Sequence, residues 1–198
     1  LGFGRYETFQ QSYARPNLSY SVRMVDDKER KLISVLKSVP GSAIVYVNTR
    51  KAAKQIATLL FKNGISTDFY HAGLKHSVRS EKQKKWILNN VRVMVATNAF
   101  GMGIDKPDVR LVIHFNLPQN LESYYQEAGR AGRNNKKAFA LTITNKADLI
   151  EIKDKINLQY PSLDYIKRVY QSLSNYYHLA VGSGGNINYD FDIHDFSE

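Results

Sequence analysis

A chain of 198 residues, 43% hydrophobic and 23% charged, is long enough to bury a core, so we expect one compact domain with room for a small appendage. It has no cysteine, which excludes a disulfide scaffold and a cysteine-ligated zinc site, and no apolar stretch approaches the ~20 residues that span a bilayer. The formal net charge of +10 indicates a polyanionic partner such as nucleic acid, although a merely soluble basic protein fits this charge equally well.

The beginning of the chain differs in pattern from its middle. Residues 1–25 lack the alternation of strand and helix patterns, and Pro16 fixes an extended entry into a strand, so we expect a linker that ends in an entry strand. Asp26 and Glu29 then suggest the capping box of a helix, which Pro40 ends.

The middle of the chain alternates buried strands with amphipathic helices. The predicted strands are 43–47, 67–71, 91–96, 109–115 and 138–144, and predicted helices cover 52–60, 77–88 and 123–131. Ser77 is expected to cap the second of these helices. This order predicts an α/β fold over 26–145, a RecA-like or Rossmann-like parallel sheet flanked by helices, with functional loops at the carboxyl ends of the strands.

The end of the chain is predicted to form an appendage. Residues 146–181 should be a small helical subdomain, because apolar residues recur at core-facing spacing: Leu163, Ile166, Val169, Leu173 and Tyr176. The glycine-rich stretch from Gly182 and the acidic residues after it predict a flexible acidic connector over 182–198.

The strongest functional signal is the ten-residue string YYQEAGRAGR, residues 124–133. Arg130 and Arg133 are three residues apart, so they should share one face near a helix end, and the neighbouring glycines let another surface approach closely. Arginine suits multivalent phosphate binding, and an arginine that reaches a transferring phosphoryl group is a known catalytic device. A bare pair of arginines is more often a solvated helix end, but the complete string argues against that alternative.

The second signal is the string VATNAFGMGIDKP, residues 95–107. A buried strand leads into a loop of hydroxyl, amide and glycine groups, and such a loop can present backbone N–H groups to phosphates. Asp105 is suited to accept hydrogen bonds from ribose hydroxyls. Two glycines after a strand more often form a tight turn, but the arginine string at this spacing favours a phosphate site.

Together these strings resemble the last two motifs of superfamily 2 helicases. FGMGIDKPDVRLVIHFNLP followed by YYQEAGRAGR resembles, in particular, the RecQ family of ATP-dependent DNA helicases. Arg15-Pro16-Asn17 resembles that family's entry into its second RecA-like domain, AIVYVNTR (43–50) its motif IV, and YHAGL (70–74) its motif IVa.

The resemblance implies a role for each matching position. Arg133 would be the arginine finger that reaches a γ-phosphate across an interdomain cleft, and Arg130 its neighbour in phosphate sensing. Gln126 would help to hold the nucleotide or the cleft, and Gly103 and Asp105 would couple the nucleotide to the motor. The predicted lining of a single-strand track is Asn48, Thr49, Arg50, His71, Gly73 and Thr97. For His71, a simple packing role stays an equal alternative.

The chain contains neither a GxxxxGK(S/T) loop nor the acidic magnesium motif, the Walker A and DExH motifs, which hold phosphates and Mg²⁺ in P-loop ATPases. The resemblance assigns both motifs to a first RecA-like domain of the same polypeptide, preceding residue 1 and binding most of ATP and Mg²⁺. We therefore expect this chain alone to be inactive. The intact protein would be a cytoplasmic, nucleoid-associated motor that unwinds DNA in repair or recombination.

The sequence departs from the family at two places. Asn134-Asn135 stands where the family often has Asp-Gly, and asparagine tolerates the same turn geometry. Many RecQ proteins carry a four-cysteine zinc subdomain after the motor, so this chain resembles a zinc-less variant, with residues 169–177 as the matching stretch.

Two other functions stay open. A DEAD-box-like RNA helicase half would use the same motor, although that family usually has His-Arg where Gln126-Glu127 stands. A non-catalytic nucleic-acid-binding module that kept the fold would bind a strand without supporting hydrolysis.

Overall fold

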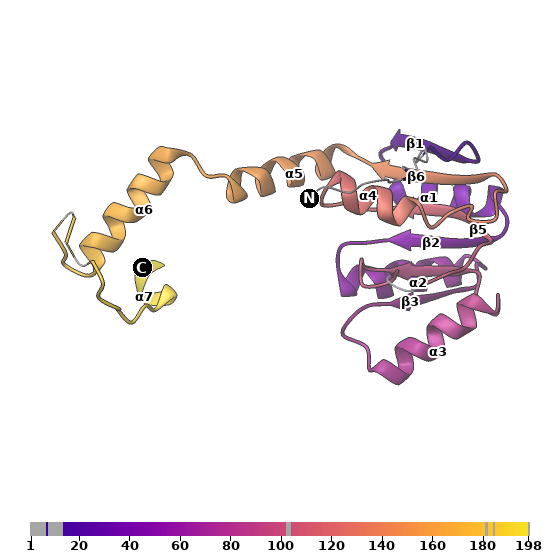
Figure 1. The fold of residues 1–198 in the computed structure, drawn as a ribbon, viewed down its shortest axis with the longest axis horizontal. Coiled ribbons are helices and arrows are strands. Elements are labelled where there is room, and N and C mark those ends of the chain that lie inside the picture. Colours follow the sequence, from indigo (N-terminus) through magenta and orange to yellow (C-terminus); the bar gives the residue numbers. More distant parts are fainter. Residues whose placement is uncertain (1–6, 8–13, 102–103, 181, 184, 198) are drawn as a thin grey trace. The chain divides into compact units, whose positions relative to one another are not determined.

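The computed structural model describes residues 7, 14–101, 104–180, 182–183 and 185–197 of the chain (Figure 1). The chain divides into two compact units, residues 1–148 and residues 149–198.

The first unit is built on one sheet of six strands in the order β1-β6-β5-β2-β4-β3. The strands are β1 (Leu18–Met24), β2 (Ser42–Tyr46), β3 (Thr67–Tyr70), β4 (Val93–Ala96), β5 (Val109–His114) and β6 (Ala138–Thr144). Every neighbouring pair runs parallel. The predicted parallel α/β fold is therefore confirmed, and β1 is the entry strand at one edge of the sheet.

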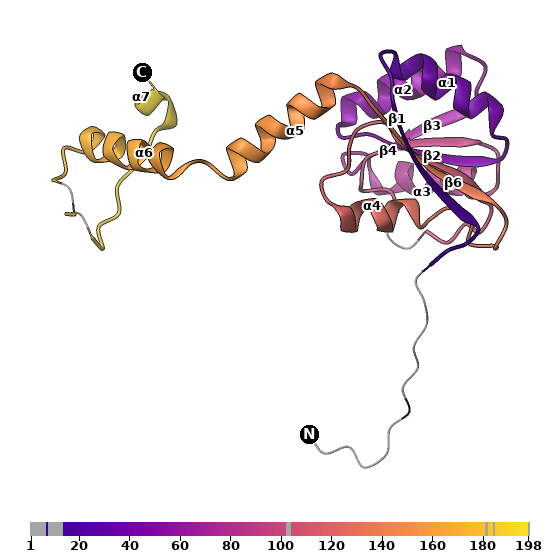
Figure 2. The ribbon, with the colours of Figure 1, turned by 90° about the horizontal axis from the view of Figure 1, so that it is seen from above.

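Helices cover both faces of this sheet, as Figure 2 shows. They are α1 (Lys28–Ser38), α2 (Arg50–Lys62), α3 (His76–Ile87) and α4 (Leu121–Ala128). Because successive strand side chains point to opposite faces, Val45 packs in the core beneath α1 and α2, whereas Ile44 packs with residues of α3 and α4. Trp86 of α3 is fully buried and donates its indole N–H to Ala43 O at 3.2 Å.

Two predicted helix starts are wrong. Asp27, not Asp26, is the N-cap of α1: its backbone is extended and its carboxylate accepts from Arg30 N at 2.9 Å. Ser77 caps nothing, because α3 begins at His76 and Ser77 is already helical. An N-cap residue needs a non-helical backbone, which a sequence pattern locates only to within a residue or two.

The predicted helix 123–131 ends earlier than expected. α4 begins after Asn120, whose side chain accepts from Ser123 N at 2.8 Å, and it ends at Ala128. Gly132 adopts a left-handed φ of 67° and donates its N–H across to Val109 O at 2.8 Å, so the backbone leaves the helix. Residues 129–133, which we call the arginine loop, therefore follow α4 and are not its last turn.

The second unit contains α6 (Leu163–Tyr176) and α7 (Ile193–Ser197), while α5 (Lys146–Gln159) runs from the first unit into it. Two of the predicted core residues of α6, Leu163 and Ile166, are 66% and 50% exposed, so that part of the prediction is wrong. The packing contacts of α6 lie at its other end, where the ring of Tyr176 meets Phe191 and Phe196.

The predicted acidic connector also packs on α6. Tyr177 Oη donates to Asp190 O at 2.8 Å, and its ring lies 4.8 Å from that of Tyr189. The described part of residues 182–198 is thus held by aromatic contacts rather than being a free linker. Among the described residues, none of the helices has the length and hydropathy that a membrane crossing requires.

One ion pair joins the start of α1 to the start of α5. Lys28 Nζ lies 2.9 and 2.8 Å from the two carboxylate oxygens of Asp148, and the side chains are only 8% and 11% exposed. Replacing Asp148→Asn leaves the ammonium group unpaired and should lower the free energy of unfolding by about 3 kcal/mol. Urea denaturation followed by the fluorescence of Trp86, the only tryptophan, measures this in the first unit.

The matched control is Glu81→Gln, which breaks an exposed pair with Lys85 in α3 of the same unit, whose side chains are 63% and 51% exposed. That change should cost far less than Asp148→Asn, because exposed pairs contribute little. Equal losses in the two variants would contradict the assignment of Lys28–Asp148 as a buried structural pair.

Candidate functional site

The predicted single-strand residues all lie at one end of three neighbouring strands. Parallel strands end at the same edge of a sheet, and β2, β4 and β3 are adjacent in it. Asn48, Thr49 and Arg50 follow β2, His71 and Gly73 follow β3, and Thr97 follows β4. The structure thus brings these six residues to the edge where the sequence predicted functional loops.

Arg50 and Gly73 are in close contact within this group. A Cβ built on Gly73 would lie 2.7 Å from Arg50 Nη1, so no larger residue fits there without moving the guanidinium group. Burial, followed by the positive charge of Arg50, lowers the pKa of His71 and favours its neutral form.

Two other members of the group are less available than predicted. Thr49 Oγ1 accepts from Ala52 N at 3.0 Å and is the N-cap of α2, so the hydroxyl already has a structural partner. Thr97 is only 8% exposed, and its N–H donates to Tyr70 O at 3.2 Å, which ties the end of β4 to β3.

Predicted nucleotide residues from two distant strings line one open cavity of about 690 Å³, which we call the arginine cavity. Its lining is Gly101, Ile104, Asp105, Tyr125, Gln126, Gly129, Arg130 and Arg133. Four of the five residues predicted to bind nucleotide are in this set, and the fifth, Gly103, lies outside the described residues. The volume is in the range of small-molecule sites.

Arg133 and Asp105, both predicted to contact nucleotide, bind each other. Arg133 Nη1 donates to Asp105 Oδ1 at 3.0 Å and to Ile104 O at 3.2 Å. This pairing uses only Oδ1 of Asp105, so the exposed carboxylate can still accept a hydrogen bond from a ribose hydroxyl. The side chains are 38% and 83% exposed, and an exposed pair of this kind contributes at most about 1 kcal/mol, so a phosphate can replace the carboxylate.

Arg130 is held more firmly and retains an unused donor. One of its Nη atoms donates to Gly101 O, while its buried Nε is without a hydrogen-bond partner among the described residues. A Cβ on Gly101 would lie 2.2 Å from Arg130 Nη2, so only glycine allows this approach. A buried N–H without a partner is costly, and a bound anion would relieve that cost.

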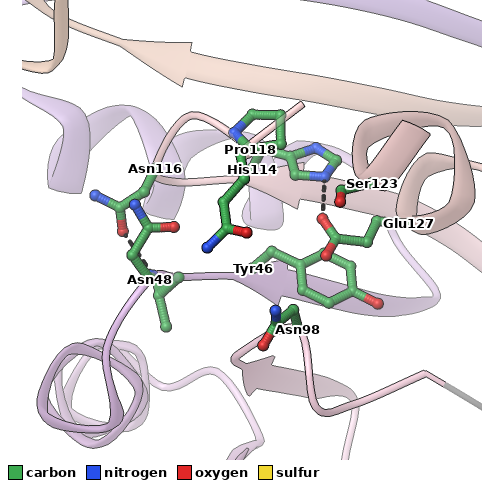
Figure 3. A pocket seen from close by; sticks show the side chains of 10 residues that line it. Tyr46, Asn48, Asn98, His114, Asn116, Pro118, Ser123 and Glu127 are labelled. Atoms are coloured by element: carbon green, nitrogen blue, oxygen red, sulfur yellow. Dashed lines mark hydrogen bonds and ion pairs between the residues drawn. The ribbon is translucent and has the colours of Figure 1, made fainter. Parts of the chain in front are cut away.

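A small polar cavity of about 70 Å³, called the amide pocket, lies beside the ends of β2 and β5 (Figure 3). Its lining is Tyr46, Val47, Asn48, Asn98, His114, Asn116, Pro118, Gln119, Ser123 and Glu127. Of these, only Asn48 was predicted from the sequence to bind a ligand. Asn98 and Glu127 stand inside the two functional strings, which was the available signal.

A buried polar pair lies on the α4 side of the amide pocket, as Figure 3 shows. His114 Nε2 lies 2.8 Å from Glu127 Oε2, and the histidine is 1% exposed. The His114 ring stacks on Tyr46 at 5.5 Å, and Tyr46 Oη donates to Phe100 O at 3.0 Å. Burial raises the pKa of Tyr46, so its hydroxyl stays protonated and remains a donor. These contacts join β2 and α4 to the segment that carries Gly101.

Comparison with known proteins agrees with this geometry. Residues 27–135 match the family model of the helicase conserved C-terminal domain. The chain is 43% identical over 153 residues to the RecQ-like DNA helicase blm-1 of Caenorhabditis elegans, covering 75% of this chain and 15% of that protein. It is 44% identical over 151 residues to the ATP-dependent DNA helicase RecQ of Pasteurella multocida, covering 76% and 24%.

The fold resembles a solved DEAD box protein from Methanococcus jannaschii with a TM-score of 0.60 and 29% identity, over 69% of this chain and 38% of that one. The chain spans less than a quarter of the length of either RecQ relative. The family model covers more than half of the chain, and the relatives confirm the resemblance seen in the motifs. The chain therefore belongs to the helicase conserved C-terminal domain family and is a RecQ-like member of it.

Proposed function

We propose that this chain is the second motor domain of an ATP-dependent DNA helicase, which couples ATP hydrolysis to translocation along a strand and to unwinding. One observation carries the proposal: residues from two strings more than twenty positions apart, Asp105 and the pair Arg130 and Arg133, line one cavity. The residues present fit a nucleotide phosphate, because the buried Nε of Arg130 has no hydrogen-bond partner among the described residues and the side-chain partner of Arg133, Asp105, is exposed.

The arginine cavity would serve the transition state. Arg133 would exchange Asp105 for the γ-phosphate oxygens and stabilise the charge that develops there, while Arg130 and Gln126 hold the neighbouring groups. Bound Mg²⁺ would neutralise phosphate charge and would be held, with most of ATP, by a first RecA-like domain of the same polypeptide. This chain alone would then not hydrolyse ATP.

The residues after β2, β3 and β4 would contact the sugar–phosphate backbone of single-stranded DNA. Arg50, with Gly73 allowing its approach, provides charge, and Asn48 provides an amide. Contacts of this kind hold a strand without reading its bases, as a translocating motor requires. The net charge of +10 supports a polyanionic ligand.

A series of hydrogen bonds connects the arginine cavity to the residues that would contact single-stranded DNA. Gly101 O accepts from Arg130, and the preceding carbonyl, that of Phe100, accepts from Tyr46 at the end of β2. The same segment begins at Thr97, whose carbonyl accepts from Phe100 N at 3.0 Å. A shift of Arg130 toward a phosphate would therefore move backbone that is bonded to the strand-binding edge.

The RNA helicase alternative has support from a putative ATP-dependent RNA helicase of Acanthamoeba polyphaga mimivirus, 38% identical over 146 residues, and from the DEAD box likeness, at 29% identity. The DNA helicase relatives are more similar, at 43% and 44%. Glu127 also favours the RecQ assignment, because an arginine at this position, as in the usual DEAD-box His-Arg pair, could not accept a hydrogen bond from His114. Comparing duplex DNA with duplex RNA as substrates of the intact polypeptide decides between them.

The central test is Arg133→Ala in the intact polypeptide that carries this domain. ATP turnover stimulated by single-stranded DNA should fall by about 10³-fold or more, as for other arginine fingers, with little change in DNA affinity. The matched control is Arg23→Ala, an exposed arginine of β1 whose side chain, within the described part of the chain, donates to the neighbouring Val22 O and to no other group. Unchanged turnover in Arg133→Ala would reject the motor assignment and favour a non-catalytic binding module.

Arg50→Ala should separate strand binding from hydrolysis. Loss of one phosphate contact should weaken binding of single-stranded DNA and lower the slope of log Kd against log salt by about 0.7. Fluorescence anisotropy over a series of salt concentrations measures the slope, with Arg23→Ala again as control. An unaltered salt slope would place Arg50 off the strand path.

Arg50→Ala also tests whether the charge of Arg50 lowers the pKa of His71. Removing the positive charge of Arg50 removes one cause of the lowered pKa, so the pKa of His71 should rise toward its ordinary value. The histidine would then be protonated over a wider pH range below neutrality. Proton NMR titration of this chain follows the ring signals, and an unchanged His71 pKa would contradict an electrostatic effect of Arg50 on this histidine.

A further inference from the structure

Two side chains of the segment before β1 bind the arginine loop. Arg15 Nη1 donates to Gly129 O at 3.3 Å, and Arg15 Nη2 donates to Ala131 O at 3.1 Å and Gly132 O at 2.8 Å. Asn17 Nδ2 adds bonds to Gly132 O at 2.7 Å and Lys136 O at 3.0 Å. In the sequence, these residues were only the mark of a domain entry.

The backbone of this segment is itself fixed, so both side chains are aimed at the loop. Leu18 N donates to Arg15 O at 3.0 Å, which closes a turn around Pro16. Ala138 N donates to Asn17 O at 2.9 Å, so the segment is already bonded to the start of β6. Arg15 is half-buried. These contacts leave the guanidinium group little freedom to point elsewhere.

The bonds satisfy the carbonyl of Gly129, the C-cap of α4, and two carbonyls of the arginine loop beyond the helix. The last carbonyls of a helix have no partner within it, and a cation there also meets the negative end of the helix dipole. A planar guanidinium group with several donors suits a set of carbonyls better than the single ammonium group of lysine does. A Cβ on Gly132 would lie 2.6 Å from Asn17 Nδ2, so the loop and the segment fit closely.

The carbonyls that Arg15 binds belong to the residues next to Arg130 and Arg133. Arg130 lies between Gly129 and Ala131, and Arg133 follows Gly132 directly. Arg15 is not among the residues that line the arginine cavity, so it would act through the loop and not on the nucleotide.

We infer that Arg15, supported by Asn17, is a positioning residue for catalysis: it sets the backbone from which Arg130 and Arg133 reach the phosphates. The inference rests on the proposed motor function and deepens it. Loss of Arg15 leaves both arginines present but misplaced, and misplacement by about 1 Å can cost on the order of 100-fold in rate.

The test uses Arg15→Ala, Arg133→Ala and the double variant in the intact polypeptide. Arg15→Ala should lower kcat for DNA-stimulated ATP hydrolysis on the order of 10- to 100-fold, with KM for ATP and DNA affinity nearly unchanged. Because Arg15 acts through the arginine loop, the double variant should be no slower than Arg133→Ala alone. Arg15→Lys, which keeps the charge but not the fork, should lie between Arg15→Ala and the unchanged protein.

Asp148→Asn is the control for a merely structural role, since it weakens the same unit away from the loop. Assayed below its melting temperature, it should keep the kcat of the unchanged protein. If Arg15→Ala does not fold, the kcat of Arg15→Lys, alone and combined with Arg133→Ala, is compared in the same way. Full turnover in Arg133→Ala would overturn the motor function itself. Two results would overturn the positioning role alone. In the first, Arg133→Ala lowers kcat while the Arg15 variant keeps the kcat of the unchanged protein. In the second, the double variant lowers kcat by the product of the two single effects.

Discussion

The parallel pairing of all six strands is the constraint on which the candidate sites depend. Each strand must be followed by a connection that returns to the opposite end of the sheet, so the carboxyl ends of all the strands lie at the same end of the sheet. The strand register then makes these loops begin next to one another, because the last residue of β2, Tyr46, pairs with the last residues of β4 and β5, Ala96 and His114. Loops that are far apart in sequence therefore start side by side, and both the arginine cavity and the predicted single-strand residues are built from them.

Buried polar contacts then place individual helices on this frame. His114 on β5 meets Glu127 on α4, and Lys28 on α1 meets Asp148 at the start of α5. Pairs of this kind add little net stability compared with apolar packing, but each is costly to break. They therefore favour one position of the helix over its neighbours, and α4 carries Gln126 into the arginine cavity from the position that Glu127 helps to fix.

Much of this arrangement follows from local sequence patterns. The five strands predicted within 26–145 agree with the structure to within two residues, because short β-branched and apolar runs buried on both faces leave few alternatives. The ends of helices were harder to predict, as Asp27, Ser77 and the early end of α4 show. A cap depends on the backbone angles of single residues. Contacts across the chain were out of reach: Arg15 and Gly132 are 117 residues apart, and no period or spacing links them. The pairing of Arg133 with Asp105 escaped the prediction for the same reason.

The bonds from Arg15 also bear on where this domain begins. The family match starts at residue 27, after β1, so a fragment trimmed to that boundary would keep Gln126, Arg130 and Arg133 unchanged. It would nevertheless lose the strand that pairs with β6 and the donors that bind the arginine loop. The newly exposed edge of β6 would be open to pairing with another chain, and the arginine loop would lose four hydrogen bonds at once. The smallest unit that preserves the contacts of the arginine loop is therefore longer than the smallest unit that preserves the motifs.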